Sequence, residues 1–159
     1  MSHRVSVLLG VLSIWLAATA CPALAQETHW FAAFEGQSVS PHIARTDTQR
    51  LLEVGTVETD GFSELRISIA GEFKEGIPRG GMVGAILIPD INPFTYLLQQ
   101  EGKIVFATEV KVPIGMQPSA IFFSEAVVAK VAFPAYRIYL YNDTPSAANV
   151  NVYVYRVRL

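Results

Sequence analysis

Residues 136–159 read YRIYLYNDTPSAANVNVYVYRVRL, which is the clearest β pattern in the chain. Inward and outward side chains alternate along 136–141 and again along 150–159, as they do in strands with one buried face. The connecting residues 142–149 are rich in Asn, Asp, Pro and Ser, which favour turns. The pattern therefore predicts two strands joined by a loop.

We expect these two strands to pair as an antiparallel hairpin with Tyr139 opposite Tyr153. This register keeps both alternations in phase, whereas a one-residue slip would turn apolar side chains towards solvent. The apolar face then consists of Ile138, Leu140, Val152 and Val154. The opposite face gathers the candidate ligand-binding residues Arg137, Tyr139, Tyr141, Asn151, Tyr153 and Tyr155.

Tyrosine and arginine side chains on an exposed sheet can stack against sugar rings or anchor a protein interface. Tyrosine is also a good strand residue, so the same side chains can stabilise a sheet by cross-strand pairing or lie beneath a loop. Both interpretations stay open at this point. They differ in one respect, because a binding face requires the tyrosine rings to be exposed side by side.

The β pattern continues through most of the chain. Further strands are predicted at 29–34, 50–59, 62–73, 82–88, 103–112, 119–123 and 126–133, with a long loop at 35–48. The continuously apolar segment 82–88 indicates a strand buried on both faces. Asp60-Gly61 predicts a hairpin between the strands on either side of it. Residues 94–100 fit either a short strand or one or two helical turns, and Phe106 is expected to face the core.

About nine or ten strands at intervals of about 8–12 residues, with no long helix, are typical of a β-sandwich or barrel. Long loops interrupt the simple meander and suggest crossings between two sheets. We therefore predict an all-β fold, a two-sheet antiparallel β-sandwich of the jelly-roll type, that forms a single domain over residues 26–159.

The first 25 residues have the pattern of a cleaved secretory signal peptide. Arg4 precedes a long apolar run, and Ala23-Leu24-Ala25 provides the small-x-small pattern of a cleavage site. Cleavage after Ala25 is expected, with lipidation of Cys21 and a retained anchor as the alternatives. The leader predicts a bacterial protein of the periplasm or the medium, with no transmembrane span in the mature chain.

Composition sets further bounds on the mature domain. Cleavage leaves 134 of the 159 residues, which is enough to bury a core. The chain's single cysteine, Cys21, leaves with the leader, so no disulfide is expected. Without Arg4, 11 Lys and Arg stand against 14 Asp and Glu, a formal net charge of −3. No basic stripe is present, so nucleic acid is not an expected partner.

The sequence contains no recognisable catalytic or metal-binding motif. His29 and His42 lack the compact ligand spacing of a zinc site. Ser38 or Ser40, His42 and Asp47 lie in one predicted loop, whereas catalytic triads draw on separated elements. No cofactor is expected, with calcium as an alternative at oxygen-rich turns. The calcium candidates are Asp60 with Glu64, Asp90 with Asn92, and Asn142 with Asp143.

These observations lead us to expect an exported, non-catalytic β-sandwich that binds a ligand, such as a glycan, through its tyrosine-rich face. The alternative is an interaction or assembly subunit of the cell envelope, whose partner is another protein. A small hydrolase is a third interpretation. It would require acidic or histidine side chains that converge in a pocket.

Overall fold

The computed structural model describes residues 28–115 and 119–158, with side chains from residue 31 onward. The predicted leader, its cleavage site and Cys21 lie outside the described residues. The described part contains nine strands and one helix. They are β1 (Thr28–Val39), β2 (Leu52–Glu58), β3 (Glu64–Phe73), β4 (Met82–Pro89), α1 (Asn92–Glu101), β5 (Thr108–Pro113), β6 (Ile121–Phe123), β7 (Val127–Lys130), β8 (Ala135–Asn142) and β9 (Ala148–Arg158).

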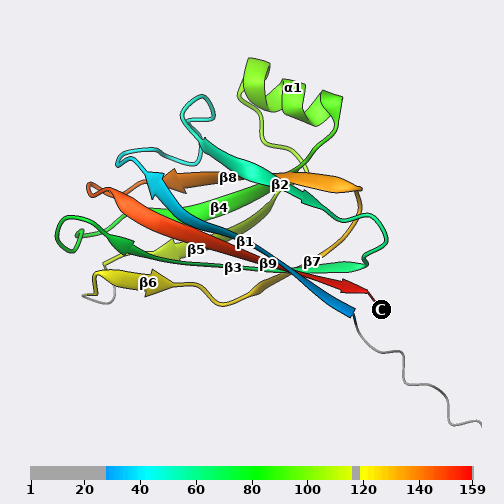
Figure 1. Ribbon diagram of the computed structural model, residues 1–159. Helices are drawn as coiled ribbons and strands as arrows, with labels where there is room; N and C mark the ends of the chain where they lie inside the picture. Colours follow the sequence, from blue (N-terminus) through cyan, green and yellow to red (C-terminus); the bar gives the residue numbers. More distant parts are fainter. Residues whose placement is uncertain (1–27, 116–118, 159) are drawn as a thin grey trace, which may run out of the picture.

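The strands form two antiparallel sheets that pack face to face (Figure 1). The five-stranded sheet has the order β1-β9-β3-β6, with β7 also paired to β3, and the four-stranded sheet has the order β2-β8-β4-β5. β6 and β7 follow one another along β3 and share one strand position. The chain passes to the other sheet at nearly every connection. Eight strand positions in this order make a jelly roll, so the predicted fold is confirmed.

The core lies between the two sheets and is built from alternate side chains of both. Val150, Val152 and Val154 of β9 are fully buried, as are Ile138 and Leu140 of β8. β4 is buried along its whole length except at its first residue, as its continuous apolar sequence predicts.

The predicted hairpin between β8 and β9 is wrong. β8 pairs with β2 and β4, whereas β9 pairs with β1 and β3, so the two strands belong to different sheets. The alternation of apolar and polar residues fits a hairpin in one sheet and equally fits two strands in facing sheets. In the structure, the apolar sides of β8 and β9 meet across the core.

A buried polar network holds the crossing between β8 and β9. The Asn142 side-chain amide donates to the Ser146 carbonyl at 2.8 Å, and its oxygen accepts from the Thr144 hydroxyl at 2.7 Å. Asn142 and Thr144 are both fully buried. Buried polar groups need such partners, so this loop has a defined path from one sheet to the other.

The Asp60-Gly61 turn is present, but it does not make the predicted hairpin. Gly61 has a φ of 76°, and the Phe62 amide donates to the Thr59 carbonyl at 3.0 Å. The strands on either side, β2 and β3, lie in different sheets. The Asp60-Gly61 pair therefore predicted the turn between β2 and β3 correctly, but it did not predict that the two strands pair with other partners.

Residues 94–100, for which a short strand and helical turns were both expected as alternatives, are helical. They lie within α1, which has a proline in its first turn and ends at Gly102 with a φ of 65°. Two other boundaries differ from expectation. β5 begins only at Thr108, and Phe106, expected to face the core, is 71% exposed with a φ of 51°. β1 continues into the predicted loop, past an irregularity beside Gly36.

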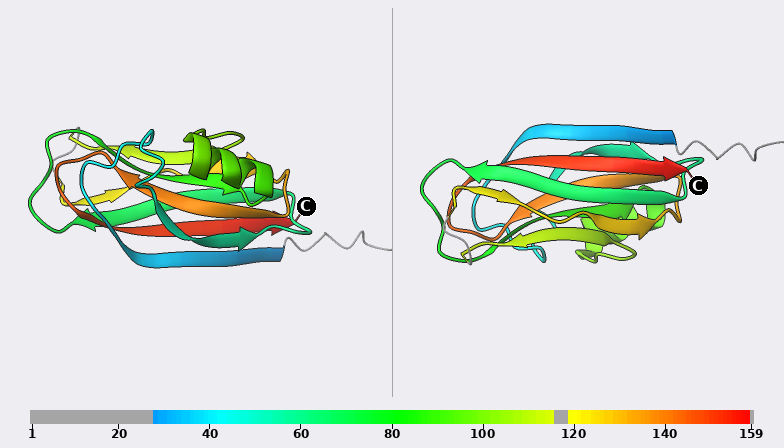
Figure 2. Two further views of the ribbon diagram at one scale, coloured as in Figure 1. Left: turned by 90° about the horizontal axis from the view of Figure 1, so that it is seen from above. Right: turned by 90° about the horizontal axis from the view of Figure 1, so that it is seen from below.

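The two outer faces of the sandwich differ in what lies over them. α1 and residues 40–51 lie over the four-stranded sheet, and Leu98 of α1 is 2% exposed. The opposite view shows the five-stranded sheet, over which no helix of the described residues lies (Figure 2). In the described ranges, no helix is long and apolar enough to span a membrane.

Candidate functional site

The six predicted site residues divide between the two sheets. Arg137, Tyr139 and Tyr141 lie on β8, whereas Asn151, Tyr153 and Tyr155 lie on β9. Each set points away from the core, as the alternation predicted. Because the two strands are in different sheets, the two sets point to opposite sides of the molecule. The single tyrosine face is therefore wrong.

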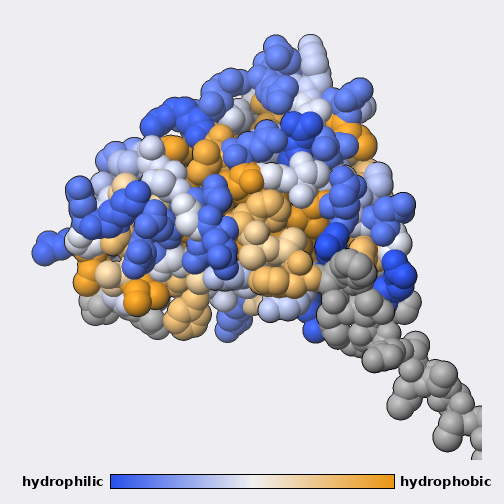
Figure 3. Space-filling model, viewed as in Figure 1, coloured by the Kyte–Doolittle hydropathy of each residue, from blue (hydrophilic) through white to orange (hydrophobic). Residues whose placement is uncertain are grey.

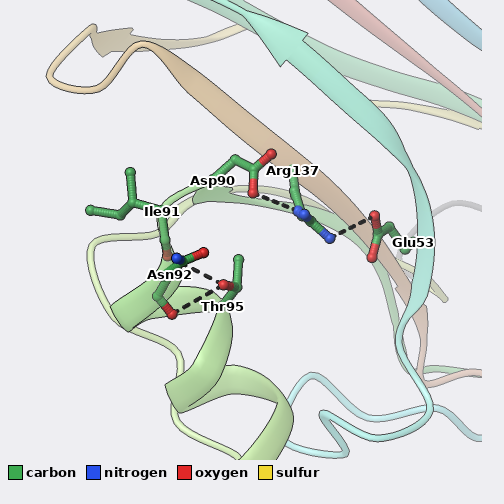
Figure 4. A network of polar contacts seen from close by, with 6 residues as sticks. All are labelled: Glu53, Asp90, Ile91, Asn92, Thr95 and Arg137. Atoms are coloured by element: carbon green, nitrogen blue, oxygen red, sulfur yellow. Dashed lines mark hydrogen bonds and ion pairs between the residues drawn. The ribbon is translucent and has the colours of Figure 1, made fainter.

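Arg137 is held by two carboxylates beside the start of α1 (Figure 4). Its Nε donates to Asp90 at 2.7 Å, and its Nη1 lies 3.4 Å from Glu53. The hydrogen bond to Asp90 raises the pKa of Arg137. In the same view, the Thr95 hydroxyl donates to carbonyl groups at the start of the helix. Arg137 thus ties β8 to β2 and to the segment that leads into α1.

Tyr139 and Tyr141 are 5% and 2% exposed, under the segments that cover their sheet. The Tyr141 hydroxyl donates to Glu109 at 2.7 Å, and its ring lies so close to Gly84 that a Cβ there would be 2.5 Å away. The Tyr139 hydroxyl lies near the Glu53 and Arg137 side chains, but among the described residues no group is placed to make a well-formed hydrogen bond with it. These two rings form part of a second buried layer and are not available to a ligand.

The environment of both hydroxyl groups favours their neutral form. Burial, together with the nearby Glu53 carboxylate, raises the pKa of Tyr139 to about 12. Burial and the hydrogen bond to Glu109 also raise the pKa of Tyr141. Neither hydroxyl is therefore suited to act as a base near neutral pH.

The outer face of the five-stranded sheet, which we call the β9 face, keeps the other three predicted residues. One row crosses four strands, from Phe31 through Tyr155 and Arg66 to Val128. The Phe31 ring lies 4.9 Å from the Tyr155 ring and 6.0 Å from the Tyr153 ring, centroid to centroid. The β9 face comprises Phe31, Arg66, Ala70, Glu72, Ile121, Phe123, Val128, Asn149, Asn151, Tyr153 and Tyr155.

The end of the β9 face nearest β6 mixes amide, carboxylate and apolar groups. Ala70 lies between Asn151 and Phe123, and Glu72 lies between Asn149 and Ile121. A shallow hollow of about 330 Å³ is lined here by Gly36, Ala70, Gly71, Glu72, Ile121, Asn149 and Asn151. The Gly36 amide donates to the Asn151 side chain at 2.7 Å and fixes its orientation.

Apolar side chains gather over β1 and β9 in the space-filling view, with more at β6 (Figure 3). Sequence reasoning missed four exposed apolar residues of the β9 face: Phe31, Ile121, Phe123 and Val128. They lie in strands with apolar side chains on both sides, a composition that equally fits complete burial. Their exposure depends on the absence of a covering segment, which strand periodicity does not report.

The polar groups considered for chemistry are engaged elsewhere. Within residues 28–115 and 119–158, no three His, Cys, Asp or Glu side chains gather in a group that could hold a metal ion. Lys74 donates to the Ser38 hydroxyl at 2.8 Å, and Asp47 pairs with Arg50 at 3.2 Å. On the β9 face, Arg66 pairs with Glu64 at 2.9 Å. The arrangement offers rings for stacking and groups for hydrogen bonding.

Comparisons with known proteins give only distant similarities. No family model matches the chain, and no curated protein matches it. The infectious bursal disease virus VP2 subviral particle is similar at a TM-score of 0.47 and 14% identity, over 91% of this chain and 37% of that one. The structure of the Gx strain of this virus is similar at a TM-score of 0.47 and 12% identity, over 97% of this chain and 40% of that one. The Triatoma virus empty capsid is similar at a TM-score of 0.30 and 12% identity, over 96% of this chain and 80% of that one.

This chain spans less than half the length of the two bursal disease virus chains that it resembles. At these TM-scores the similarities carry no argument about what the protein does.

Proposed function

We propose that this chain is an exported, non-catalytic interaction module that binds another protein on its β9 face. The leader pattern supports export to the periplasm or the medium of a bacterium. The outer face of the five-stranded sheet, which no described segment covers, supports the binding role.

The observation that carries the proposal is the concentration of exposed large apolar side chains on one face. Of eight such side chains in the part of the chain with described side chains, five belong to the β9 face. They are Phe31 at 51%, Tyr155 at 45%, Val128 at 58%, Ile121 at 65% and Phe123 at 75% exposed. Exposed large apolar side chains that gather on one face of a domain are typical of an interaction site.

The composition of the β9 face favours a protein over a small ligand. Phenylalanine, tyrosine and arginine are enriched where protein partners gain most of their binding energy. Arg66 lies within the aromatic row, between Tyr155 and Val128. The Glu64 carboxylate neutralises Arg66 at the edge of this surface, so a partner that covers the row need not supply a countercharge.

A glycan is the second candidate, and the hollow beside Asn151 is the observation that favours it. Its volume of about 330 Å³ is at the small end of ligand pockets. Amide and carboxylate groups line it, and Tyr153 and Phe123 lie next to it on the same face. Sugar recognition needs both such hydrogen-bonding groups and rings for stacking.

Site-specific photo-crosslinking in the native cells tests the protein-binding proposal. A photoreactive phenylalanine analogue is placed at Tyr155, at Phe123 or, as the control, at Tyr96 of α1, which is 59% exposed but lies off the β9 face. We expect positions 155 and 123 to capture the same protein and position 96 to capture none of it. Equal capture from all three positions, or none from positions 155 and 123, would contradict the proposal.

A glycan array separates the two candidates. Binding by the parent that is lost in folded Asn151→Ala and Tyr153→Ala variants, and kept in Tyr96→Ala, would favour the glycan. If the parent binds no glycan while photo-crosslinking succeeds, the protein partner stands.

A further inference from the structure

The free edge of β1 is a second interaction surface, distinct from the β9 face. β1 pairs along its length with β9, and no other described strand pairs with its opposite edge. β1 lies at the border of the molecule in both views of Figure 2. A strand in this position presents unpaired backbone donors and acceptors, which can pair with another strand.

The other edge strands have features that oppose such pairing. β6 and β7 contain three and four residues. β5 carries Glu109 and Lys111 and ends at Pro113, whereas β2 carries Glu53 and Glu58 and has an irregularity before Gly55. Short length, charge, proline and irregularity all protect a sheet edge. β1 has twelve residues, no Lys, Arg or Pro, and a single formal charge at Glu35. Its own irregularity lies between Phe34 and Gln37, so residues 28–34 form the regular stretch of its free edge.

We propose that β1 pairs antiparallel with β1 of a second copy of this chain, about a two-fold axis near Phe31. Antiparallel pairing of identical strands is self-complementary, so one contact satisfies both copies. The proposal does not depend on the proposed function, because the pairing is made by the backbone edge of β1. Phe31 is the one residue of the β9 face that also takes part in it.

Charge and side-chain size favour a second copy as the occupant. Residues 28–34 contain no formally charged side chain at neutral pH, so they offer nothing to select an acidic or a basic partner. A two-fold axis near Phe31 separates the two Glu35 residues by roughly 27 Å, well beyond the screening length of about 8–10 Å. Ala32 and Ala33 next to the axis leave room for the approaching strand.

The exposed Phe31 ring supports the position of the axis. Phe31 is 51% exposed and already packs against Tyr155 on one side. In the proposed dimer, the two Phe31 residues become cross-strand neighbours, and aromatic pairs of this kind stabilise a sheet. The two five-stranded sheets become one continuous sheet, and the β9 face extends over both copies.

Pairing of one strand buries less surface than the roughly 1,200–2,000 Å² of a stable complex. We therefore expect dimerisation to depend on concentration. The protein is expressed from its full coding sequence, recovered after the host's processing, and studied by sedimentation equilibrium over a wide concentration range.

The test variant is Ala33→Lys, and the matched control is Ala126→Lys; both alanines are exposed, and Ala126 lies outside β1. We expect the parent and the control to dimerise at high concentration and Ala33→Lys to require at least about tenfold more protein. A parent that stays monomeric, or an Ala33→Lys variant that dimerises like the parent, would overturn the proposal.

Amide hydrogen exchange of the unmodified parent makes the test independent of whether a variant folds. Exchange in β1 is expected to slow as concentration rises, whereas exchange in β2 and β5 stays constant. If the mass doubles while the rate of amide exchange in β1 stays the same, the contact between the copies lies elsewhere and the proposal is overturned.

Discussion

Strands β8 and β9 have similar side-chain patterns but differ in what lies outside them. Both place aliphatic side chains in the core and tyrosines on the outer face. On β8, the outward tyrosines belong to the sheet over which α1 and residues 40–51 lie, and Tyr139 and Tyr141 are almost fully buried. On β9, Tyr155 is 45% exposed. Alternation determines the side to which a residue points, whereas a segment from elsewhere in the chain decides whether that side is a second buried layer or a surface.

The cover of the four-stranded sheet is held by specific contacts. Gln49 donates to the Gln99 carbonyl at 2.7 Å, which links residues 40–51 to α1. Arg45 pairs with Glu109 at 3.2 Å, which fixes the same segment to β5. Glu109 also accepts the Tyr141 hydroxyl, so the cover and the buried tyrosine share one carboxylate.

Truncation of one tyrosine on each strand should show the largest difference. We expect Tyr141→Ala to lower the free energy of unfolding by about 3–5 kcal/mol, because it empties a buried site. Tyr155→Ala should cost no more than about 1 kcal/mol, because its ring is already half in water. Urea denaturation measures both values. Equal losses would contradict the difference in cover.

Loosening α1 should affect one sheet more than the other. Leu98→Ala removes the buried side chain of the helix and should cost about 2–4 kcal/mol. Because α1 lies over the four-stranded sheet, amide exchange should accelerate in α1 and β4 before it does in β9 and β3. Uniform acceleration in both sheets would show that the helix is not a separate cover.

High pH should destabilise the fold through the covered tyrosines. Tyr139 ionises near pH 10 when unfolded but at about 12 in the fold, so the unfolded state loses its proton first. The contribution of Tyr139 to the free energy of unfolding is therefore fully present below about pH 10. It falls by about 1–3 kcal/mol as the pH approaches 12. Urea denaturation at pH 9 and 11.5 should show a smaller fall for Tyr139→Phe. The same fall in the variant would contradict the assignment.

The smallest predicted effects distinguish the two covered tyrosines from each other. Tyr141→Phe removes the hydrogen bond to Glu109 and should cost about 1–2 kcal/mol. Tyr139→Phe removes a buried hydroxyl without a described partner, so stability should stay the same or rise by up to about 1 kcal/mol. Thermal denaturation at pH 7 compares the two variants. A similar loss in both variants would mean that the Tyr139 hydroxyl makes a stabilising hydrogen bond, and would contradict the prediction.

The fold could be predicted from the sequence because strand periodicity reports local structure. The jelly-roll class, the doubly buried β4 and most strand positions follow from alternation and turn signals. Strand partners do not follow, because the loop at Asn142 and the turn at Gly61 lead the chain to the opposite sheet. The crossing at Asn142 depends on a buried network with Thr144 and Ser146, whose spacing resembles ordinary turn chemistry.

For the six candidate residues, strand periodicity predicted the side of the sheet to which each side chain points, but not whether that side is exposed. Asn151, Tyr153 and Tyr155 face outward on an uncovered sheet, as their alternation indicates. Arg137, Tyr139 and Tyr141 also face outward, but α1 and residues 40–51 lie above them. No local pattern around β8 reports a cover contributed by residues more than thirty positions away.

The most direct test of the contrast between the two faces is hydroxyl-radical footprinting of the dilute protein, read by mass spectrometry at each aromatic residue. We predict rapid modification of Phe31, Phe123 and Tyr155, and strong protection of Tyr139 and Tyr141. Comparable reactivity of the β8 and β9 tyrosines, or protection of Phe31, Phe123 and Tyr155, would contradict the account of one covered and one open face.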